Sequence, residues 1–273
     1  MLPLLYCLNC QISKNSLIIR RTRSCLPRKN SHLGTSFRQY FKIVPALTEE
    51  LKREAYRVRH SVYCEDLQFE SSRSDGFEID EYDAHSLHLL IRSINNDTFI
   101  GCTRIIRPSS NSNDRRLPFE KTCAQTLDRS IIDPSRLPAD KIGEVSRLAV
   151  IAAFRRRKGE KNHPINISEE DFSTGPMMRF PYIPLGLYIG TIELARIHDI
   201  RVLFMLTEER LASHFSRLGA QLEPIGAPVE HRGLRFPSMV EINSIISNMR
   251  PIFRPLYQAI AEDIKAELEK KHH

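Results

Sequence analysis

The residues best placed to do chemistry lie in one apolar segment, Gly143–Val150, which carries a carboxylate, a hydroxyl and a guanidinium. Its apolar residues predict a buried strand, and a buried charge is costly unless it is paired or used. We select Glu144 as the candidate proton acceptor, with Ser146 and Arg147 as its candidate catalytic neighbours. The alternative for Glu144 is a structural ion pair with Arg147 or Arg104, which would lower the pKa of its carboxyl and weaken it as a base.

Three upstream segments also set charge beside apolar strand or helix residues: Arg59–Tyr63, Glu78–Asp83 and Gly101–Arg104. The aspartates Asp80 and Asp83 stand three residues apart where a loop meets a strand. We predict that they form an ion-pair network with Arg59 and Arg104 around a substrate pocket, and the alternative is a solvated acidic loop. The two arginines could instead bind the carboxylate of a small molecule with paired hydrogen bonds.

The elements that position these residues follow from hydrophobic periodicity and turn signals. A helix is predicted from Thr48 to about Tyr63, because apolar residues recur at helical spacing behind a threonine cap and two glutamates. Residues 70–78 are polar and form a loop. Two apolar strands separated by Asn95-Asn96-Asp97 predict a hairpin, with strands at Ser86–Ser93 and Thr98–Ile106.

The second half of the chain alternates helices and strands. We expect a short helix at 117–127, strand 142–153, helix 184–197, strand 201–206, helix 208–218 before Gly219, strands 220–224 and 229–240, and an amphipathic C-terminal helix. Residues 155–181 are charged and carry proline and glycine, which predicts a mobile insertion. This order implies an α/β (α+β) fold with a mixed central sheet flanked by helices on both faces.

The positive charge of the chain is concentrated at its start. Residues 1–48 hold eight basic residues and no acidic one, whereas the remainder holds 32 basic and 33 acidic residues. We therefore interpret residues 1–38 as a basic disordered leader, with an organellar transit peptide as the alternative, and residues 39–273 as a single domain. The neutral body argues against a nucleic-acid partner, and no apolar run is long enough to span a membrane.

Cysteine usage favours a reducing compartment. Three of the six cysteines lie in the leader, and the others, Cys64, Cys102 and Cys123, have no metal-like spacing. We predict no metal site, and a reduced, cytoplasmic protein.

Together the charged segments resemble a known family over about two thirds of the chain. The matching motifs are Arg59–Tyr63, Leu67-Gln68-Phe69, Glu78-x-Asp80-x-x-Asp83, Gly101-x-x-Arg104, Leu117-Pro118-Phe119 and Glu144-x-Ser146-Arg147. They resemble the acyl-homoserine lactone synthases, which implies the GNAT-like acyl-CoA N-acyltransferase fold. The segments Tyr56–Cys64 and Pro224–Glu230 are more similar to N-acyl amino acid synthases and the acyltransferases associated with the PEP-CTERM/exosortase system.

The resemblance implies transfer of a fatty acyl group from acyl carrier protein, or from acyl-CoA, to the amine of an amino acid or similar acceptor. No bound cofactor is implied, because the acyl-phosphopantetheine arm is a co-substrate. The lactone synthases have tryptophan where this chain has Phe69, and this chain contains no tryptophan. This difference argues against S-adenosylmethionine as the acceptor. The alternatives to amino acid acylation are an acyl-homoserine lactone synthase using S-adenosylmethionine and a non-catalytic acyl-binding regulator.

Acyl transfer gives each candidate residue a role. Glu144 would take the proton from the attacking amine, an effect of roughly 10² to 10⁴ in rate. Backbone N–H groups at a bulge in the same strand, between Leu148 and Val150, would bind the oxyanion. Ser146 would orient the thioester or the leaving thiol, although a strand serine more often bonds locally. Tyr63 and Phe69 would line the pocket, and the alternative for both is plain core packing.

A run of four cations follows the candidate strand: Arg155, Arg156, Arg157 and Lys158. Acyl carrier protein is strongly acidic, so this run could bind it by charge, and the alternative is a solvated loop. Pro184-Leu185-Gly186 opens a helix without the glycine-rich sequence typical of coenzyme A sites. This absence favours carrier protein over free coenzyme A as the donor.

Overall fold

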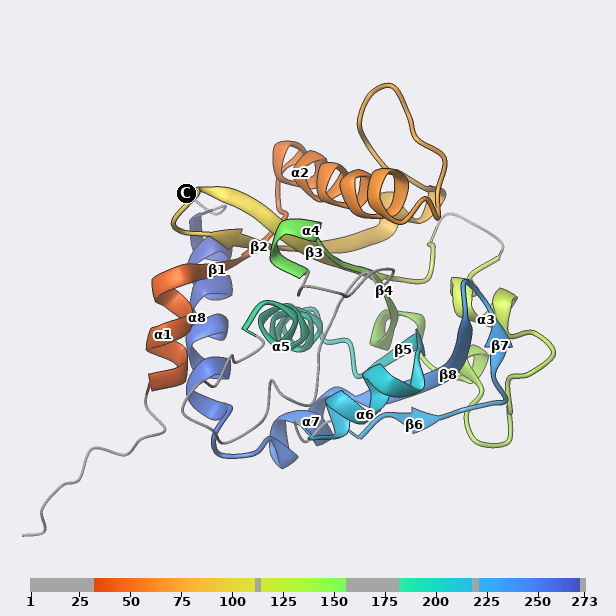
Figure 1. Cartoon of the computed structure of the whole chain (residues 1–273). Helices are drawn as coiled ribbons and strands as arrows, with labels where there is room; N and C mark the ends of the chain where they lie inside the picture. Colours follow the sequence, from red (N-terminus) through yellow and green to blue (C-terminus); the bar gives the residue numbers. More distant parts are fainter. Residues whose placement is uncertain (1–31, 111–113, 156–181, 218–220, 271–273) are drawn as a thin grey trace, which may run out of the picture.

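The computed structural model describes residues 32–110, 114–155, 182–217 and 221–270. They form a mixed sheet with helices on both faces, which confirms the predicted fold class (Figure 1). The strand order is β1-β2-β3-β4-β5-β8-β6, with β7 paired to β8, and only β4 and β5 run parallel among these pairs. The strands are β1 (Phe41–Pro45), β2 (Ser86–Ser93), β3 (Thr98–Ile106), β4 (Ile142–Val150), β5 (Val202–Thr207), β6 (Glu223–Pro224), β7 (Val229–Glu230) and β8 (Leu234–Glu241).

The helices divide between the two faces of the sheet. The α-helices are α1 (His32–Tyr40), α2 (Glu49–Arg59), α3 (Pro118–Thr122), α4 (Ala152–Arg155), α5 (Tyr182–Ile197), α6 (Glu209–Arg217), α7 (Ile242–Asn248) and α8 (Arg254–Lys270). Helix α2 covers one face, and α5 and α8 cover the other. None of the helices in the described residues is long and apolar enough to cross a membrane.

The predicted hairpin is confirmed with the predicted bounds, as β2 and β3. Its apolar residues serve both layers, because successive side chains of a strand point to opposite faces. Leu89 belongs to the cluster under α5 and α8, whereas Leu90 belongs to the cluster under α2. The sheet is therefore buried on both sides at its centre, where charged residues need specific partners.

The first predicted helix is also confirmed. The Thr48 hydroxyl accepts a hydrogen bond from the N–H of Leu51 at 3.3 Å and caps α2. The helix then widens into a π-helical turn, residues His60–Asp66. This turn directs Tyr63 toward β4, where its hydroxyl donates to the carbonyl of Leu148 at 3.2 Å.

Helix α5 lies unusually close to the sheet, because it presents glycines to it. A Cβ added to Gly190 would stand 2.7 Å from Cδ2 of Leu89, and one added to Gly186 would stand 2.7 Å from the Phe37 ring. Without side chains at these two positions, the helix backbone packs directly on β1 and β2 residues. This close packing fixes the height of α5 above the cavity described below.

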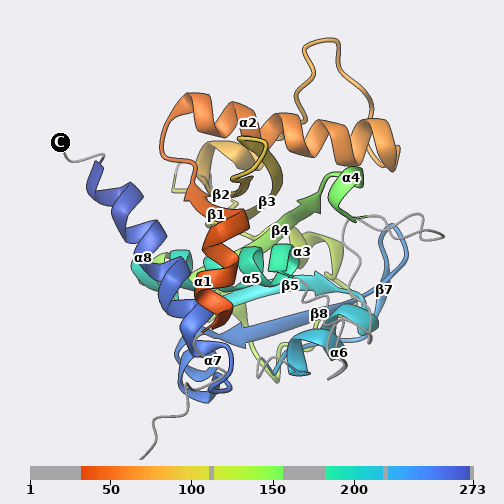
Figure 2. The same ribbon diagram turned by 60° about the vertical axis from the view of Figure 1, so that its left-hand side comes forward.

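The predicted leader extends too far into the domain. Residues 32–38 belong to α1, which lies beside α8 (Figure 2). Phe37 is fully buried, and Arg38 bonds to Asp263 at 3.1 Å and to the carbonyl of Ala259 at 2.7 Å. Phe37 is an apolar residue in a basic segment, and composition did not indicate that it is buried in the domain. The boundary at residue 38 is therefore wrong. Residues 1–31 lie outside the described residues.

Other predicted boundaries differ by a few residues. The strand expected at 142–153 ends at Val150, because the chain turns into α4. The helix expected at 117–127 is only α3, and the strand expected at 229–240 is divided into β7 and β8 by a turn at residues 231–233. Of the expected insertion, residue 155 ends α4, and 156–181 lie outside the described residues.

Candidate active site

The centre of the sheet opens into a cavity where β4 and β5 separate. Their parallel ladder contains three residue pairs, from Ile142 with Val202 to Glu144 with Phe204. Beyond these pairs both strands continue, and residues of each line the same cavity of about 450 Å³. That volume lies within the usual range for small-molecule sites. A gap between two parallel strands is therefore the place where this fold can receive a ligand.

One wall of the cavity is apolar. It comes from α5, β5, α6 and β8, and includes Ile192, Leu203, Met205, Leu211, Phe215 and Val240. Tyr188 of α5 stacks on Phe215 with ring centroids 4.4 Å apart. This wall suits a hydrocarbon chain, because apolar contact replaces water at a gain proportional to the area covered.

A bulge distorts β4 beside the cavity. In the ladder between β3 and β4, Arg104 pairs with Ser146 and Cys102 pairs with Ala149. Two residues of β4, Arg147 and Leu148, therefore stand opposite a single residue of β3. Arg147 has φ of +53°, in the left-handed region that non-glycine residues rarely adopt. Such bulges redirect side chains and backbone groups next to active sites.

Glu144 is buried at the closed end of the cavity, with 5% of its surface exposed. Its Oε2 accepts a hydrogen bond from the N–H of Phe119 at 2.8 Å. Burial raises the pKa of the Glu144 carboxyl to about 8, and neither this hydrogen bond nor the more distant charges of Arg104 and Arg147 offset that effect. The alternative of a structural ion pair is wrong for the described residues, in which Glu144 has no arginine within salt-bridge distance.

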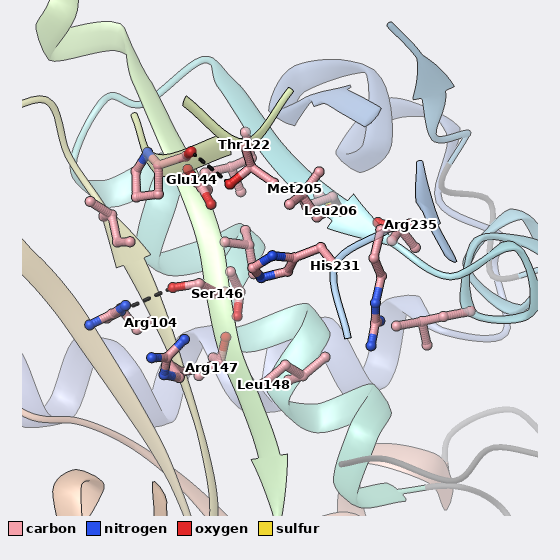
Figure 3. A pocket seen from close by; sticks show the side chains of 18 of the residues that line it. Arg104, Thr122, Glu144, Ser146, Arg147, Leu148, Met205, Leu206, His231 and Arg235 are labelled. Atoms are coloured by element: carbon pink, nitrogen blue, oxygen red, sulfur yellow. Dashed lines mark hydrogen bonds between the residues drawn. The ribbon is translucent and has the colours of Figure 1, made fainter. Parts of the chain in front are cut away.

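The arginines near Glu144 are instead engaged by a separate group of acids. Arg59 pairs with Glu78 and with Asp83, the latter at 2.6 Å. Arg104 contacts Asp80 at 2.6 Å and Asp83 at 2.5 Å. The predicted ion-pair network is present, and the alternatives of a solvated loop and of free carboxylate-binding arginines are wrong for these residues. Arg104 also donates through Nε to the Ser146 hydroxyl at 3.0 Å (Figure 3).

Arg147 extends this network to the cavity mouth. Its Nη2 contacts Glu78 at 2.9 Å, Glu70 at 3.1 Å and Asp80 at 3.3 Å. Burial alone would raise the pKa of the Glu78 carboxyl, but hydrogen bonds from Arg147 and Arg59 outweigh it and hold the pKa below its ordinary value. The network is therefore ionised, and it supports the bulge by holding the Arg147 side chain.

The turn between β7 and β8 closes over the same mouth. Arg232 at its tip pairs with Glu70 at 2.5 Å and lies over the Phe69 ring, 5.8 Å from its centroid. His231 and Arg235 flank the tip, and both line the cavity. Figure 3 shows the His231 imidazole pointing across β4 toward Ser146, with Arg235 on the side opposite Arg104.

Comparison with known proteins identifies relatives of the fold. Residues 58–162 match the family model described as an acetyltransferase (GNAT) domain. The match covers 105 of the 273 residues and indicates an acyltransferase with a GNAT domain in this segment. No curated protein sequence matches the chain. The motifs that resemble the lactone synthases, from Arg59 to Arg147, lie in this matched segment, whereas the Pro224–Glu230 segment, His231 and Arg235 lie outside it.

Solved structures share the fold of this acyltransferase at low sequence identity. BjaI, a CoA-dependent acyl-homoserine lactone synthase solved with SAM and isopentyl-CoA, has 18% identity and a TM-score of 0.52 over 82% of this chain and 89% of its own. The acyl-homoserine lactone synthase LasI has 19% identity and a TM-score of 0.51, over 77% and 95%. FeeM, an N-acyl amino acid synthase from uncultured soil microbes, has 14% identity and a TM-score of 0.49, over 77% and 94%.

The structure brings most predicted site residues of the acyltransferase together. The residues that line the cavity are Tyr63, Phe69, Asp80, Arg104, Glu144, Ser146, Arg147 and Leu148. Arg59 and Asp83, predicted as substrate-binding, lie instead behind the cavity in the buried network. Val150 pairs with Gly101 and packs in the core, because the bulge lies earlier in β4 than we expected.

The predicted carrier-protein contact at Arg155 needs correction. Its guanidinium is buried, with 2% of the side chain exposed, and pairs with Asp66 at the end of the π-helical turn. A buried, paired cation cannot form part of an exposed docking surface. Arg156, Arg157 and Lys158 lie outside the described residues.

Sequence reasoning missed the cavity residues of the C-terminal half, namely Tyr188, His231, Arg232 and Arg235. Tyr188 follows the proline and glycine that open α5, and its position in the helix is all that the sequence shows. His231 and Arg232 directly follow the Pro224–Glu230 segment of the resemblance. A basic and aromatic cluster beside that segment was the available signal.

Proposed function

We propose that this acyltransferase moves a fatty acyl group from the thioester of acyl carrier protein to the amine of an amino acid. The observation that carries the proposal is the position of Glu144: a carboxyl with a raised pKa stands at the polar end of a cavity whose other wall is apolar. The cavity, about 450 Å³, exceeds what an acetyl group needs. It suits a longer chain beside a proton-accepting group.

In the proposed reaction, the amine nitrogen attacks the thioester carbonyl and forms the new C–N bond. The ionised Glu144 takes a proton from this nitrogen. When the tetrahedral intermediate collapses, the C–S bond breaks and the same proton passes to the leaving sulfur. A pKa of about 8 is well matched to this exchange, because a base acts best when its pKa is near the working pH.

The bulge in β4 supports binding of the oxyanion. Arg147 and Leu148 stand opposite one residue of β3, so their backbone groups depart from the regular ladder on the cavity side of the sheet. A single well-aimed N–H donor contributes roughly 3 to 4 kcal/mol to such a transition state. The ion pairs of Arg147 with Glu78 and Glu70 keep the bulge rigid, so that little reorganisation accompanies the reaction.

Arg235 is the cavity arginine that best fits the carboxylate of an amino acid. Arg104 and Arg147 each contact two or more carboxylates of the network, and Arg232 is held by Glu70 and lies over the Phe69 ring. Arg235 contacts Glu208 at 2.8 Å and the carbonyl of Arg232 at 3.3 Å. A guanidinium has five N–H donors in a planar arrangement, so Arg235 retains donors for a second carboxylate. The resemblance to N-acyl amino acid synthases and exosortase-associated acyltransferases also favours this class of acceptor.

Two other features bear on the donor. Helix α5, which carries Pro184-Leu185-Gly186 in its first two turns, lacks a glycine-rich sequence for the pyrophosphate of coenzyme A, which favours carrier protein. BjaI, which shares the fold, is CoA-dependent, so acyl-CoA belongs in every assay as the competing donor. We propose a cytoplasmic location, where both donors are made.

The test is turnover of purified protein with acyl carrier protein or coenzyme A loaded with saturated chains of several lengths. A panel of amino acids and S-adenosylmethionine serves as acceptors, and mass spectrometry identifies the product. We expect an N-acyl amino acid and one free thiol for each product formed. Lactone formation from S-adenosylmethionine would instead identify a lactone synthase, and acyl binding without any turnover would identify a non-catalytic regulator.

A further inference from the structure

The stoichiometry of the proposed reaction requires two proton transfers from one nitrogen. An amino acid enters as an ammonium cation at neutral pH, and the amide nitrogen of the product keeps one hydrogen. One of the two protons ends on the leaving thiol, and the other must reach solvent. Glu144 is buried in the cavity, so it suits the transfer of a proton to the thiol and is poorly placed to release a proton to solvent.

His231 also lines the cavity, and the ordinary pKa of a histidine lies near neutral pH. It is exposed at the mouth, and Figure 3 shows its imidazole directed into the cavity toward Ser146. Its position is fixed on both sides. The backbone N–H of His231 donates to the carbonyl of Gly233 at 2.9 Å, and the neighbouring Arg232 pairs with Glu70 across the mouth at 2.5 Å.

The charges around His231 keep the imidazole neutral. Partial burial lowers its pKa, as do Arg232 and Arg235 on the same hairpin and Arg147 on β4, whereas Glu70 acts weakly in the opposite direction. A neutral imidazole can accept a proton, and an exposed one can pass it to water.

We propose that His231 accepts the first proton, from the ammonium group of the incoming acceptor, and releases it to solvent. The free amine then attacks the thioester, and Glu144 transfers the second proton from nitrogen to sulfur. This inference rests on the proposed function, and it assigns one proton transfer to the exposed His231 and the other to the buried Glu144.

The test compares His231→Gln with wild type, using the best amino acid of the acceptor panel and its α-aminooxy analogue. The analogue keeps the carboxylate, but its nitrogen is unprotonated at neutral pH and needs no first proton transfer. With the amino acid at pH 7, we expect kcat/KM of the variant to fall at least about tenfold and to recover as the pH rises toward the pKa of the amine. With the aminooxy analogue, the variant should match wild type within about twofold.

The matched control is His198→Gln, whose imidazole also has a pKa lowered by burial but does not line the cavity. It should behave as wild type with both acceptors. An equal loss with both acceptors, or a loss that persists at high pH, would overturn the role of His231 while leaving the proposed function intact. Absence of turnover by the wild type with every acceptor would overturn both.

Discussion

Two buried glutamates near β4 have opposite electrostatic surroundings. Glu78 lies between Arg59 and Arg147, and its pKa is held below the ordinary value. Glu144 has one backbone N–H donor, and burial raises its pKa to about 8. Burial alone therefore does not decide the charge of a carboxyl in this protein. The nearest cation does, and it separates a group that holds the fold from a group that can exchange a proton near neutral pH.

The largest expected effect is on the rate. Glu144→Gln keeps the shape of the side chain and removes its proton-accepting oxygen, so kcat/KM should fall by roughly 10² to 10⁴. With the α-aminooxy acceptor, whose nitrogen is unprotonated near neutral pH, wild-type kcat/KM should rise with pH up to about 8, because only the ionised carboxyl accepts a proton, and the variant should lose this rise. Steady-state kinetics over a pH series measures both.

Glu120→Gln is the matched control for that substitution. Glu120 is also buried, accepts a backbone hydrogen bond from Leu117 at 3.0 Å and has a pKa raised by burial, but it does not line the cavity. Glutamine also suits its place in the capping box of α3. Equal losses in both variants would mean that Glu144 acts through packing rather than through proton transfer.

The next effect concerns stability. Arg59→Met leaves the carboxylates of Glu78 and Asp83 buried without their shared cation, so the free energy of unfolding should fall by about 3 to 5 kcal/mol. Urea denaturation monitored by circular dichroism measures the change. An Arg59→Met protein as stable as wild type would show that the ion-pair network around Glu78 does not stabilise the fold.

A smaller effect distinguishes the two glutamates by pH. The folded pKa of Glu144 exceeds its unfolded value, so its contribution to stability is complete below about pH 4.5 and is lost as pH rises through about 8. Glu144→Gln should remove this loss, which is on the order of a few kcal/mol. Unfolding free energies of both proteins between pH 5 and 8 test this, and parallel curves would contradict it.

The smallest effect is expected at an exposed pair of the same loop. Arg73 and Asp75 form three hydrogen bonds, but both side chains are exposed and solvent screens their attraction. Arg73→Gln should leave the urea midpoint unchanged. A clear destabilisation would show that the loop, rather than burial of its charges, is what stabilises the network.

Local patterns were enough to predict the first half of the site. The spacing of Asp80 and Asp83 and the isolated charges of Arg59 and Arg104 indicated an ion-pair network, because charges in apolar segments need partners. The position of Glu144 in a buried strand followed from the same argument. The absence of an ion pair between Glu144 and an arginine could not be predicted, because it depends on the direction of each side chain in the folded sheet.

The remaining features depend on contacts distant in the sequence. His231 reaches the cavity only because β8 pairs with β5, and Arg155 is buried only because Asp66 ends the π-helical turn beside it. A run of cations is usually solvated, which is why the sequence predicted an exposed Arg155. Phe37 likewise became part of the domain through α5 and α8, which lie more than 100 residues later in the chain.

The three residue pairs that join β4 to β5 act as a seam between two half-sheets. Beyond these pairs the two strands diverge, and residues of both line the cavity. Gly143 lies in the seam, and a Cβ there would stand 2.7 Å from Cγ2 of Ile105. Ile105 belongs to β3, so a larger residue at position 143 would press β4 away from β3 and shift one of the two strands that the pairs join. The shape of the cavity can therefore change through a residue that does not line it.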